Sequence, residues 1–322
     1  NKIGETIMAT TRLDELRMVD PVLTTIAQGY VNSSMVADKL FPSVTVKKVK
    51  GKIPVFGRES FMTRETERAI RADSNRIAPS DLTLLEYETQ EHDVEMAMDY
   101  LEEEESSSVY NYEQRLTKDL ADILLLGKEK EAAGLAQDPD NYADDLKKII
   151  TSDYAWDDNS VSVVNPIQDI YEAVSAVRNK IGKYPNTMII GDSSYRVLIN
   201  HPKLTDRIKY AGIARASFAN LKELLGISNI YIGASVFTND GEVFHDVWAD
   251  NVVIAYVDQN EKGRRSEFNP SYGYILQREG KPEIDTYKEN GGKIKVIRNT
   301  DNYCIKVTCS DAAYLISNTN HN

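Results

Sequence analysis

A helix–strand–helix signal runs from Asn165 to Ser194, where the chain reads NPIQDIYEAVSAVRNKIGKYPNTMIIGDSS. The opening asparagine and proline are typical of a helix N-terminus, and Gly182 is typical of a helix end. Thr187–Gly191 is then a short apolar run typical of a buried strand, and Asp192 or Ser193 caps a helix that ends before Pro202. Apolar residues on the first helix recur at three- and four-residue steps, at Ile167, Ile170, Val174, Val177 and Ile181.

The alternation of helices and strands continues toward the end of the chain. Ser217 is expected to cap a helix whose inward residues are Leu221, Leu224 and Leu225. The turn Gly291-Gly292 leads into two last strands, at 293–298 and 303–308. Earlier strands are predicted at residues 230–232, 252–257, 272–276 and 284–287.

The first part of the chain has a different character. Residues 1–45 read as an extended arm with a short helical piece around 34–40. Residues 46–76 are basic, with nine lysines and arginines against four acids. Strand-like runs at 44–46 and 53–56 predict a long hairpin here. Because isolated two-stranded ribbons are marginal in water, we expect this hairpin to lie on another surface.

The charge then reverses. Residues 81–105 contain eleven acids and no lysine or arginine. This pattern describes either two solvated faces or two surfaces that attract each other. Residues 106–136 are predicted to form one long helix, capped by serines 106–108 and ending near Gly134. Residues 137–164 read as a loop, interrupted by a short helix at 142–150.

Composition limits the classes of function. The chain has 322 residues and a net charge of −12, which argues against a protein that grips nucleic acid. No apolar run approaches the ~20 residues of a membrane helix, and the first twenty residues lack the apolar core of a secretion signal. We therefore expect a soluble protein made in the cytoplasm. The only cysteines, Cys304 and Cys309, are expected to be small buried side chains without a disulfide or metal.

The sharpest enzymatic motif is Gly191-Asp192-Ser193, which resembles the nucleophile block of GDSL-type esterases. That family also needs an Asp-x-x-His as orienter and base, and none of the four histidines follows an aspartate at that spacing. A helix cap explains the same residues. Glu242 and His245 form a single Glu-x-x-His pair, whereas di-iron bundles use two pairs on helices. The sequence therefore predicts no catalytic residue, cofactor or metal site.

The order of segments resembles the major capsid proteins of tailed phages, which share the Hong Kong 97-type fold. Three stretches carry local resemblance. Residues 27–42 resemble the arm of many phage coats, ending in Phe41-Pro42. Residues 184–191, with 200–202 and 206–210, are similar to the entry of the central domain. Residues 221–227 with 230–233 resemble its next helix–strand unit.

The resemblance implies an α+β Hong Kong 97-type fold with five parts. These are an N-terminal arm at 1–45, an extended E-loop at 46–80, a P-domain at 81–164 with a spine helix at about 106–136, an A-domain at 165–290, and C-terminal strands at 291–322 that return to the P-domain. It also implies a coat protein whose hexamers and pentamers form the icosahedral head of a virion, assembled in the host cytoplasm. Portal, scaffold and decoration proteins are candidate partners.

Charge adds two expectations to this resemblance. The shell is expected to enclose double-stranded DNA without binding it tightly. The basic hairpin is expected to lie over acidic surface of an adjacent subunit, with contact candidates Lys47, Lys48, Lys50, Lys52, Arg58, Arg64, Arg68, Glu102, Glu103, Glu104 and Glu105. Two alternatives stay open: an encapsulin-type compartment with the same fold, and a GDSL-type esterase using Ser193.

Overall fold

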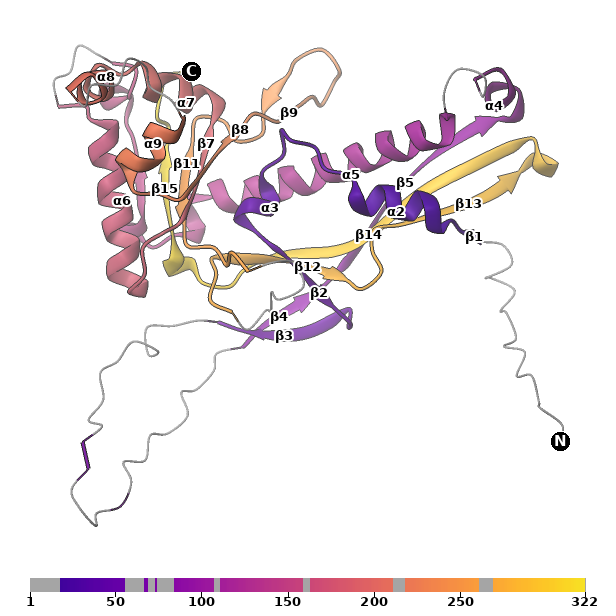
Figure 1. Cartoon of the computed structure of the whole chain (residues 1–322), viewed down its shortest axis with the longest axis horizontal. Coiled ribbons are helices and arrows are strands. Elements are labelled where there is room, and N and C mark those ends of the chain that lie inside the picture. The colour runs from indigo at the N-terminus through magenta and orange to yellow at the C-terminus, as the bar shows by residue number, and fades with distance from the viewer. Residues whose placement is uncertain are drawn as a thin grey trace. The chain divides into compact units, whose positions relative to one another are not determined.

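The computed structural model describes residues 18–55, 67–68, 73, 84–106, 111–158, 163–210, 218–260 and 269–321. Arg58 and Arg64, and the middle of the predicted hairpin, lie outside these residues. The chain divides into two compact units. Unit 1 comprises residues 1–32, 89–127 and 277–303, and unit 2 comprises 33–88, 128–276 and 304–322. Figure 1 labels most of the helices and strands of both.

Unit 1 is built on three antiparallel strands. The long strand β14 (Ile294–Val307), whose last four residues lie in unit 2, pairs with β13 (Glu283–Glu289) on one side and with β5 (Gln90–Asp99) on the other. β1 (Met18–Val19) pairs with the other edge of β13 in antiparallel orientation. The helices α2 (Pro21–Gly29), α4 (Tyr100–Ser106) and the first part of α5 (Tyr112–Gln137) belong to the same unit. Its apolar core contains Leu23, Ala27, Met98, Leu116, Leu120, Ile284 and Ile297.

The helix α2 shows that the arm is not wholly extended, which corrects the prediction for residues 21–29. The Asp20 carboxylate accepts hydrogen bonds from the backbone N–H groups of Val22 and Leu23, both at 2.9 Å, and Pro21 opens the helix. Leu23 and Ala27 then reach the core on one face. A helix of nine residues with a single apolar face gives a weak periodic signal. The turn-forming residues on either side of it therefore favour an extended arm when the sequence is considered alone.

The predicted long helix is wrong in its start. Ser106 is the last residue of α4, Ser107 and Ser108 lie outside the described residues, and α5 begins at Tyr112. The Asn111 side chain accepts from the backbone N–H of Gln114 at 3.1 Å and caps α5. The helix also continues past Gly134 to Gln137, because the small residues Ala132, Ala133 and Ala136 keep its last turns buried.

Unit 2 contains a five-stranded sheet in the order β6-β15-β11-β7-β8. β7 and β8 are parallel, β15 and β6 are parallel, and β11 is antiparallel to both of its neighbours. Figure 1 shows α6 to α9 gathered around this sheet. The strands span β6 Lys147–Ile149, β7 Thr187–Gly191, β8 Asn229–Gly233, β11 Val252–Ala255 and β15 Ala313–Ser317; the helices span α6 Pro166–Ile181, α7 Asp192–Asn200, α8 Pro202–Tyr210 and α9 Phe218–Leu225.

The helix–strand–helix order predicted for residues 165–200 is confirmed, but the predicted caps are wrong: among the described residues, the side chains of Asn165, Asp192 and Ser193 form no cap hydrogen bond, and Gly191 is the residue before α7. α6 begins at Pro166 and ends at Ile181, and the following Gly182 has the left-handed φ of 68° that favours glycine. β7 is buried at all five positions. The core of unit 2 joins Ile167, Ile170 and Val177 of α6 to residues of β7, β8, β11 and β15. This apolar layer therefore holds the helices on the sheet.

Several other predictions are wrong. Residues 142–150 contain one short 3₁₀ turn, Asp144–Leu146, and the strand β6 rather than a helix, because Lys147–Ile149 pairs with β15. The two last strands predicted at 293–298 and 303–308 are one strand, β14, because the polar run between them is buried in the ladder with β5. β15, α8 and β4 (Leu84–Glu88) were not predicted.

The smaller elements of unit 2 include α3 (Ala37–Leu40), as predicted, β2 (Ser43–Val46), β3 (Lys50–Pro54) and β12 (Gly273–Arg278), whose last two residues lie in unit 1. A short hairpin is formed by β9 (Val236–Phe237) and β10 (His245–Asp246). Cys304 and Cys309 are both buried, as expected, and no disulfide joins them among the described residues. Across the described helices, none combines the length and apolar character needed to cross a membrane.

Candidate subunit interface

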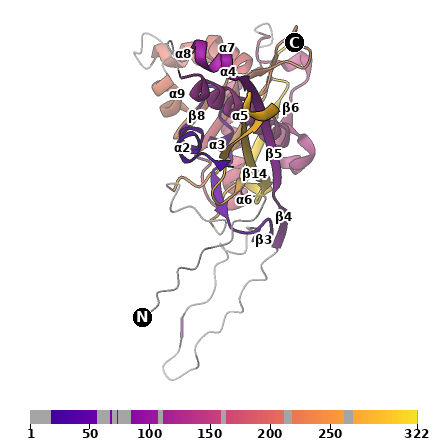
Figure 2. The ribbon, with the colours of Figure 1, turned by 90° about the vertical axis from the view of Figure 1, so that its right-hand side faces the viewer.

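The base of the predicted basic hairpin is a two-stranded antiparallel ribbon, β3–β4. Lys50, Lys52 and Pro54 lie opposite Glu88, Glu86 and Leu84, while Gly51 and Ile53 lie opposite Tyr87 and Leu85. The two strands lie side by side in both views (Figure 1 and Figure 2). Since side chains alternate along a strand, the ribbon has one charged face and one apolar face.

The apolar face of this ribbon packs on its own chain. Ile53 is buried, and it joins a cluster with Val44, Val46, Tyr274, Leu276 and Cys304 in unit 2, against which Leu85 and Tyr87 also pack. Residues 50–54 and 84–88 therefore do lie on another surface, as expected, and that surface belongs to the same subunit. Gly51 permits the close approach of Tyr87, because a Cβ there would lie 2.6 Å from the Tyr87 hydroxyl oxygen.

The charged face pairs with itself. The Lys50 Nζ lies 2.8 Å from a Glu88 carboxylate oxygen, and the Lys52 Nζ lies 2.9 Å from Glu86. The hydrogen bond and charge of Lys52 lower the pKa of the Glu86 carboxyl. All four side chains are exposed. Two of the four lysine candidates therefore already have partners within the chain, which a linear reading of charge did not reveal.

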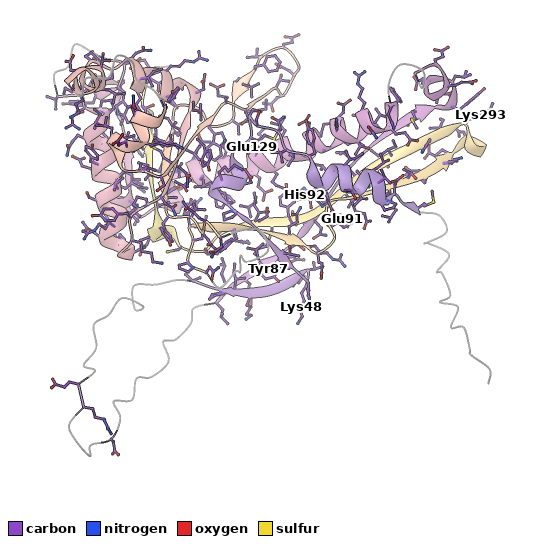
Figure 3. All side chains as sticks on the ribbon, in the orientation of Figure 1. Lys48, Tyr87, Glu91, His92, Glu129 and Lys293 are labelled. Atoms are coloured by element: carbon purple, nitrogen blue, oxygen red, sulfur yellow. The ribbon has the colours of Figure 1, made fainter. Side chains whose placement is uncertain are left out.

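The other described basic candidates are Lys47, Lys48 and Arg68, and all three are exposed. Lys47 and Lys48 lie in the turn between β2 and β3, and Figure 3 labels Lys48 beside Tyr87, whose hydroxyl donates to the Lys48 carbonyl oxygen at 3.5 Å. Within the described residues, the ammonium groups of Lys47 and Lys48 form no ion pair. Among the described residues of this segment, Lys47 and Lys48 are therefore exposed cations without an ion partner.

The acidic candidates lie on α4 in unit 1. The Glu102 carboxylate accepts from the backbone N–H of Asp99 at 3.1 Å, and the Asp99 carboxylate accepts from Leu101 at 3.0 Å. This reciprocal arrangement is a capping box that starts α4. Glu104 and Glu105 are exposed on the same helix. Glu103 belongs to α4, and its side chain lies outside the described set. Glu102 thus has a local structural role.

A second acidic surface was missed as a separate feature. Glu91, Asp93 and Glu95 alternate with inward residues on β5 and form an exposed row. Glu95 accepts from the Tyr287 hydroxyl at 2.9 Å, whereas Glu91 and Asp93 have no ion pair within the described residues. His92, next to Glu91 in Figure 3, is half-buried and stacks on Tyr303 with ring centroids 4.4 Å apart. The period-two alternation of residues 90–99 is the signal that predicts this face.

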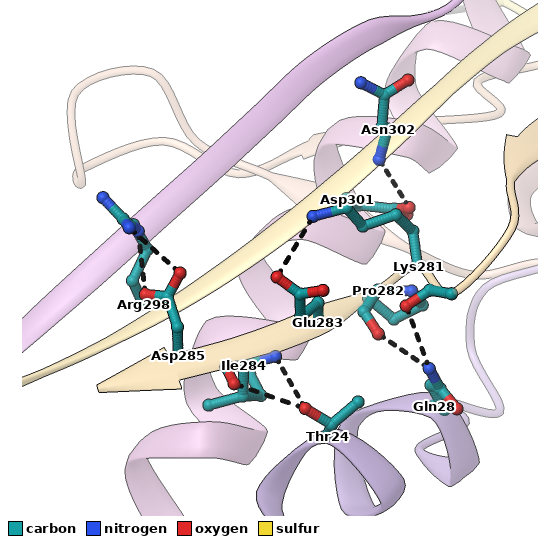
Figure 4. A network of polar contacts seen from close by, with 11 residues as sticks. Thr24, Gln28, Lys281, Pro282, Glu283, Ile284, Asp285, Arg298, Asp301 and Asn302 are labelled. Atoms are coloured by element: carbon teal, nitrogen blue, oxygen red, sulfur yellow. Dashed lines mark hydrogen bonds and ion pairs between the residues drawn. The ribbon is translucent and has the colours of Figure 1, made fainter. Parts of the chain in front are cut away.

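Polar contacts fix α2 to β13 in unit 1 (Figure 4). The Thr24 hydroxyl donates to the Ile284 carbonyl oxygen at 3.3 Å and accepts from the Ile284 N–H at 3.0 Å. The Gln28 amide donates to the Pro282 carbonyl oxygen at 3.0 Å. Beside them, Arg298 forms two 3.0 Å hydrogen bonds with the buried carboxylate of Asp285. The N-terminal helix is therefore an integral part of unit 1.

A buried carboxylate in unit 2 was also missed. Glu129 of α5 accepts from the backbone N–H groups of Val36 and Ala37 at 2.9 and 2.7 Å, and from the Trp248 indole at 2.5 Å. Burial raises the pKa of this carboxyl, although the three donors act in the opposite direction. Glu129 lies on the same helical stripe as Ala132, Ala133 and Ala136, and this position is the signal that could have identified it. Its role is to join three segments.

The residues considered for catalysis do not form a constellation. The Ser193 hydroxyl donates to the Ala249 carbonyl oxygen at 3.3 Å, and in the described residues no histidine bonds to it. Glu242 and His245 lie on the exposed β9–β10 hairpin rather than on helices. No group of three or more potential metal ligands is found among the described residues.

Comparisons with known proteins agree on one kind of protein. Residues 56–286 match the model of a family described as phage major capsid protein E. The chain is 41% identical over 310 residues to the major capsid protein of Burkholderia phage BcepMu, covering 96% of this chain and 99% of that one. It is 27% identical over 222 residues to the major capsid protein of Pseudomonas phage JBD67, covering 67% and 68%.

Solved structures are similar over most of the chain. A phage-related protein from Bordetella bronchiseptica RB50 gives a TM-score of 0.77 at 28% identity, covering 94% of this chain and 98% of that one. The capsid structure of Cyanophage P-SCSP1u gives 0.53 at 11% identity, covering 96% and 94%. The second likeness concerns the fold alone.

Proposed function

Because the chain belongs to the phage major capsid protein E family, we propose that its copies assemble as hexamers and pentamers into a closed icosahedral shell around double-stranded DNA. The chain is a phage major capsid protein with the Hong Kong 97-type capsid fold. The observation that carries the proposal is the 41% identity to a named capsid protein over nearly the whole length of both chains. The names of these relatives favour a phage shell over an encapsulin.

Electron microscopy of the purified full-length chain tests this proposal. We expect closed particles of uniform size, or rings of five and six subunits, over a range of protein concentrations. Interfaces of obligate assemblies bury roughly 2,000 Å² or more, so the particles should persist on dilution. A homogeneous monomer at high concentration would contradict the proposal. Neighbouring genes for terminase and portal proteins would distinguish a phage from an encapsulin.

The finer architecture follows the family pattern in this proposal. Residues 1–45 serve as the arm, 46–80 as the E-loop, 81–164 as the P-domain, 165–290 as the A-domain, and 291–322 as the returning strands. The shell is assembled in the host cytoplasm, with portal, scaffold and decoration proteins as partners. The protein acts as a structural subunit and not as an enzyme. The esterase alternative would be revived if the wild-type chain hydrolysed a short acyl ester and Ser193→Ala abolished that hydrolysis.

We also propose that the basic hairpin contacts acidic surface of an adjacent subunit. The exposed, unpaired state of Lys47 and Lys48 among the described residues supports them as its main described cations. Two kinds of acceptor fit: the α4 glutamates and the β5 row of Glu91 and Asp93. Exposed ion pairs contribute only about 0.2–1 kcal/mol each, so several together set register more than affinity.

Charge reversal tests this contact. Lys47→Glu with Lys48→Glu should impair assembly, measured by sedimentation and microscopy. Reversal of Lys50 and Lys52 should act partly through the ribbon itself, since their partners Glu86 and Glu88 are on the same chain. The matched control reverses two exposed lysines outside this segment, Lys288 and Lys293. Equal effects of the Lys47–Lys48 pair and the Lys288–Lys293 pair would remove the proposal.

The shell is proposed to contain DNA without holding it tightly. A net charge of −12 per subunit argues against a wall that neutralises phosphates. A near-neutral or acidic wall lets packed DNA slide during entry and exit. The measurement is retention of double-stranded DNA by purified capsomers at about 150 mM salt, where nonspecific binders show Kd values of about 10⁻⁴–10⁻⁶ M. Micromolar or tighter binding with a steep salt dependence would contradict this proposal.

A further inference from the structure

The β9–β10 hairpin has a rigid stem. The antiparallel pair places Phe237 opposite His245, with ring centroids 5.6 Å apart, and the Lys130 ammonium of α5 lies 4.0 Å from the Phe237 ring centroid. At the base, the Val247 N–H donates to the Ser235 carbonyl oxygen at 2.9 Å, and the Gln137 amide donates to the Val247 carbonyl oxygen at 2.8 Å. The hairpin is therefore fixed to the last turns of α5 within unit 2.

The tip of the hairpin, residues 238–244, is also organised. The Asp240 carboxylate accepts from the backbone N–H groups of Glu242 and Val243 at 2.9 and 3.1 Å, and from the Thr238 hydroxyl at 3.1 Å. These donors lower the pKa of Asp240. Gly241 supplies the φ of +79° that the turn requires. Its own hydrogen bonds hold the tip in one conformation before any partner binds.

This organised tip presents apolar side chains to water. Phe244 is 68% exposed, Val243 53% and Val236 45%, and every residue from 238 to 246 is exposed. In Figure 1 the hairpin carrying β9 projects away from the five-stranded sheet of the same unit. A pre-organised segment binds with less loss of conformational entropy, so a rigid apolar tip is suited to docking. The tip also carries two acids, Asp240 and Glu242, and no lysine or arginine.

A surface of complementary character lies elsewhere in unit 2, at the end of α6. Tyr184 is 63% exposed, and the Arg178 guanidinium lies 5.1 Å from its ring centroid. The Lys183 ammonium lies 4.9 Å from the Tyr256 ring centroid. In the described part of the chain, neither Arg178 nor Lys183 forms an ion pair with an acid. The exposed Tyr184 ring with Arg178 against it, and Lys183 as the preceding residue, match an apolar tip that carries acids.

We propose that the tip of the β9–β10 hairpin docks on a second copy of this chain, against the surface formed by Arg178, Lys183 and Tyr184. Tip and receiving surface are different parts of one subunit, so the contact is head-to-tail and produces a ring when the rotation between copies closes. The inference rests on the proposed assembly into hexamers and pentamers, and it names one contact that holds the ring. Val243 and Phe244 supply the apolar part and Glu242 the charge.

The first experiment removes the apolar tip. Full-length chains carrying Val243→Ser with Phe244→Ser are compared with wild type and with Val163→Ser, which changes an apolar residue that is 74% exposed elsewhere. We expect the tip variant to need at least about tenfold more protein to assemble, measured by sedimentation velocity and microscopy. The control should assemble like wild type. Assembly of the tip variant at the wild-type concentration overturns the proposal.

The second experiment exchanges charges. Glu242→Arg and Arg178→Glu should each weaken assembly, and the two together should restore it, since the pair is re-formed with opposite signs. A misfolded variant is not rescued by a change on another surface, so rescue separates docking from folding. Failure of the double variant to recover overturns the assignment to Arg178. Wild type that forms no particle rejects the proposed assembly itself, whereas wild type and tip variants that assemble alike reject the docking alone.

Discussion

The two exposed hairpins of unit 2, β3–β4 and β9–β10, differ in how much of their surface the chain itself covers. The β3–β4 ribbon buries Ile53 in a core cluster and pairs its lysines with Glu86 and Glu88 across the strands. The β9–β10 hairpin satisfies its turn through Asp240 but leaves Val243 and Phe244 in water. The comparison indicates that the base of the ribbon stabilises the subunit, whereas the apolar side chains of the second hairpin are exposed and can contact a neighbouring subunit.

The largest expected effect is the difference in stability between truncating a buried side chain of one hairpin and an exposed side chain of the other. Ile53→Ala should lower the free energy of unfolding by about 2–5 kcal/mol, because it removes buried methyl groups and leaves a cavity. Phe244→Ala should change it by no more than about 0.5 kcal/mol, because that ring is exposed in the subunit. Denaturant unfolding of unassembled chains, followed by circular dichroism, measures both. Similar losses in the two variants would erase the distinction.

Glycine substitutions give an intermediate effect with different causes in the two hairpins. Gly51→Ala would place a Cβ 2.6 Å from the Tyr87 hydroxyl oxygen, and Gly241→Ala would force alanine into a φ of +79°. Each should destabilise by about 1–3 kcal/mol, through a clash and through backbone strain respectively. Tyr87→Leu should then recover part of the loss in Gly51→Ala and none in Gly241→Ala. Recovery in both, by thermal unfolding, would show that the causes were misassigned.

The smallest effect separates the two carboxylates that the hairpins hold. The Lys52 ammonium lowers the pKa of Glu86, whereas backbone N–H groups of Glu242 and Val243 lower that of Asp240. Because salt screens exposed ion pairs, raising the ionic strength to about 1 M should return the Glu86 pKa toward its ordinary value and leave that of Asp240 nearly unchanged. NMR titration of the side-chain carboxyls measures both, and Lys52→Ala should reproduce the effect of salt on Glu86.

The sign of the pH dependence follows from the direction of these shifts. A folded-state pKa below the unfolded value gives stability that is present above the unfolded pKa. That stability is lost as the pH falls through the folded pKa. Both carboxylates should therefore favour the folded chain at neutral pH and cease to do so in acid, with the Glu86 contribution depending on salt. A contribution that grows on acidification would contradict the direction of either shift.

Elements with complete local signals were predictable from the sequence. α6 has a proline at its start, an apolar stripe and a left-handed glycine after its end, and all three were read correctly. β14 was divided in two because Asn299, Thr300, Asp301 and Asn302 look like a turn. In the structure Asp301 is buried and accepts two hydrogen bonds from Gln277, at 2.8 and 3.0 Å. The hydrogen bonds from Gln277, a residue distant in the sequence, allow this polar run to be buried in a strand. The periodicity of residues 299–302 alone does not predict such a partner.

For the candidate interface, the reversal of charge between residues 46–76 and 81–105 predicts Lys47 and Lys48 as contact residues, and this stays a prediction. Both lysines are exposed, and neither ammonium group has an ion partner among the described residues. The charge reversal did not show that Lys50 and Lys52 face Glu88 and Glu86, because β4 was not recognised and cross-strand partners depend on register. Nor did it show that Glu102 caps a helix. The sign of a charge is local information, whereas its partner is a property of the fold.

The two cysteines have a practical consequence for labelling chemistry. Burial raises the pKa of Cys304 and of Cys309 to about 11. Maleimide reagents react with the thiolate, and at pH 7 the thiolate fraction of such a group is on the order of one in ten thousand. A single cysteine introduced at Asn239, which is exposed on the β9–β10 hairpin, should therefore take up a fluorophore selectively in the otherwise native sequence. Fluorescence from that one position would then report the environment of the hairpin while subunits associate.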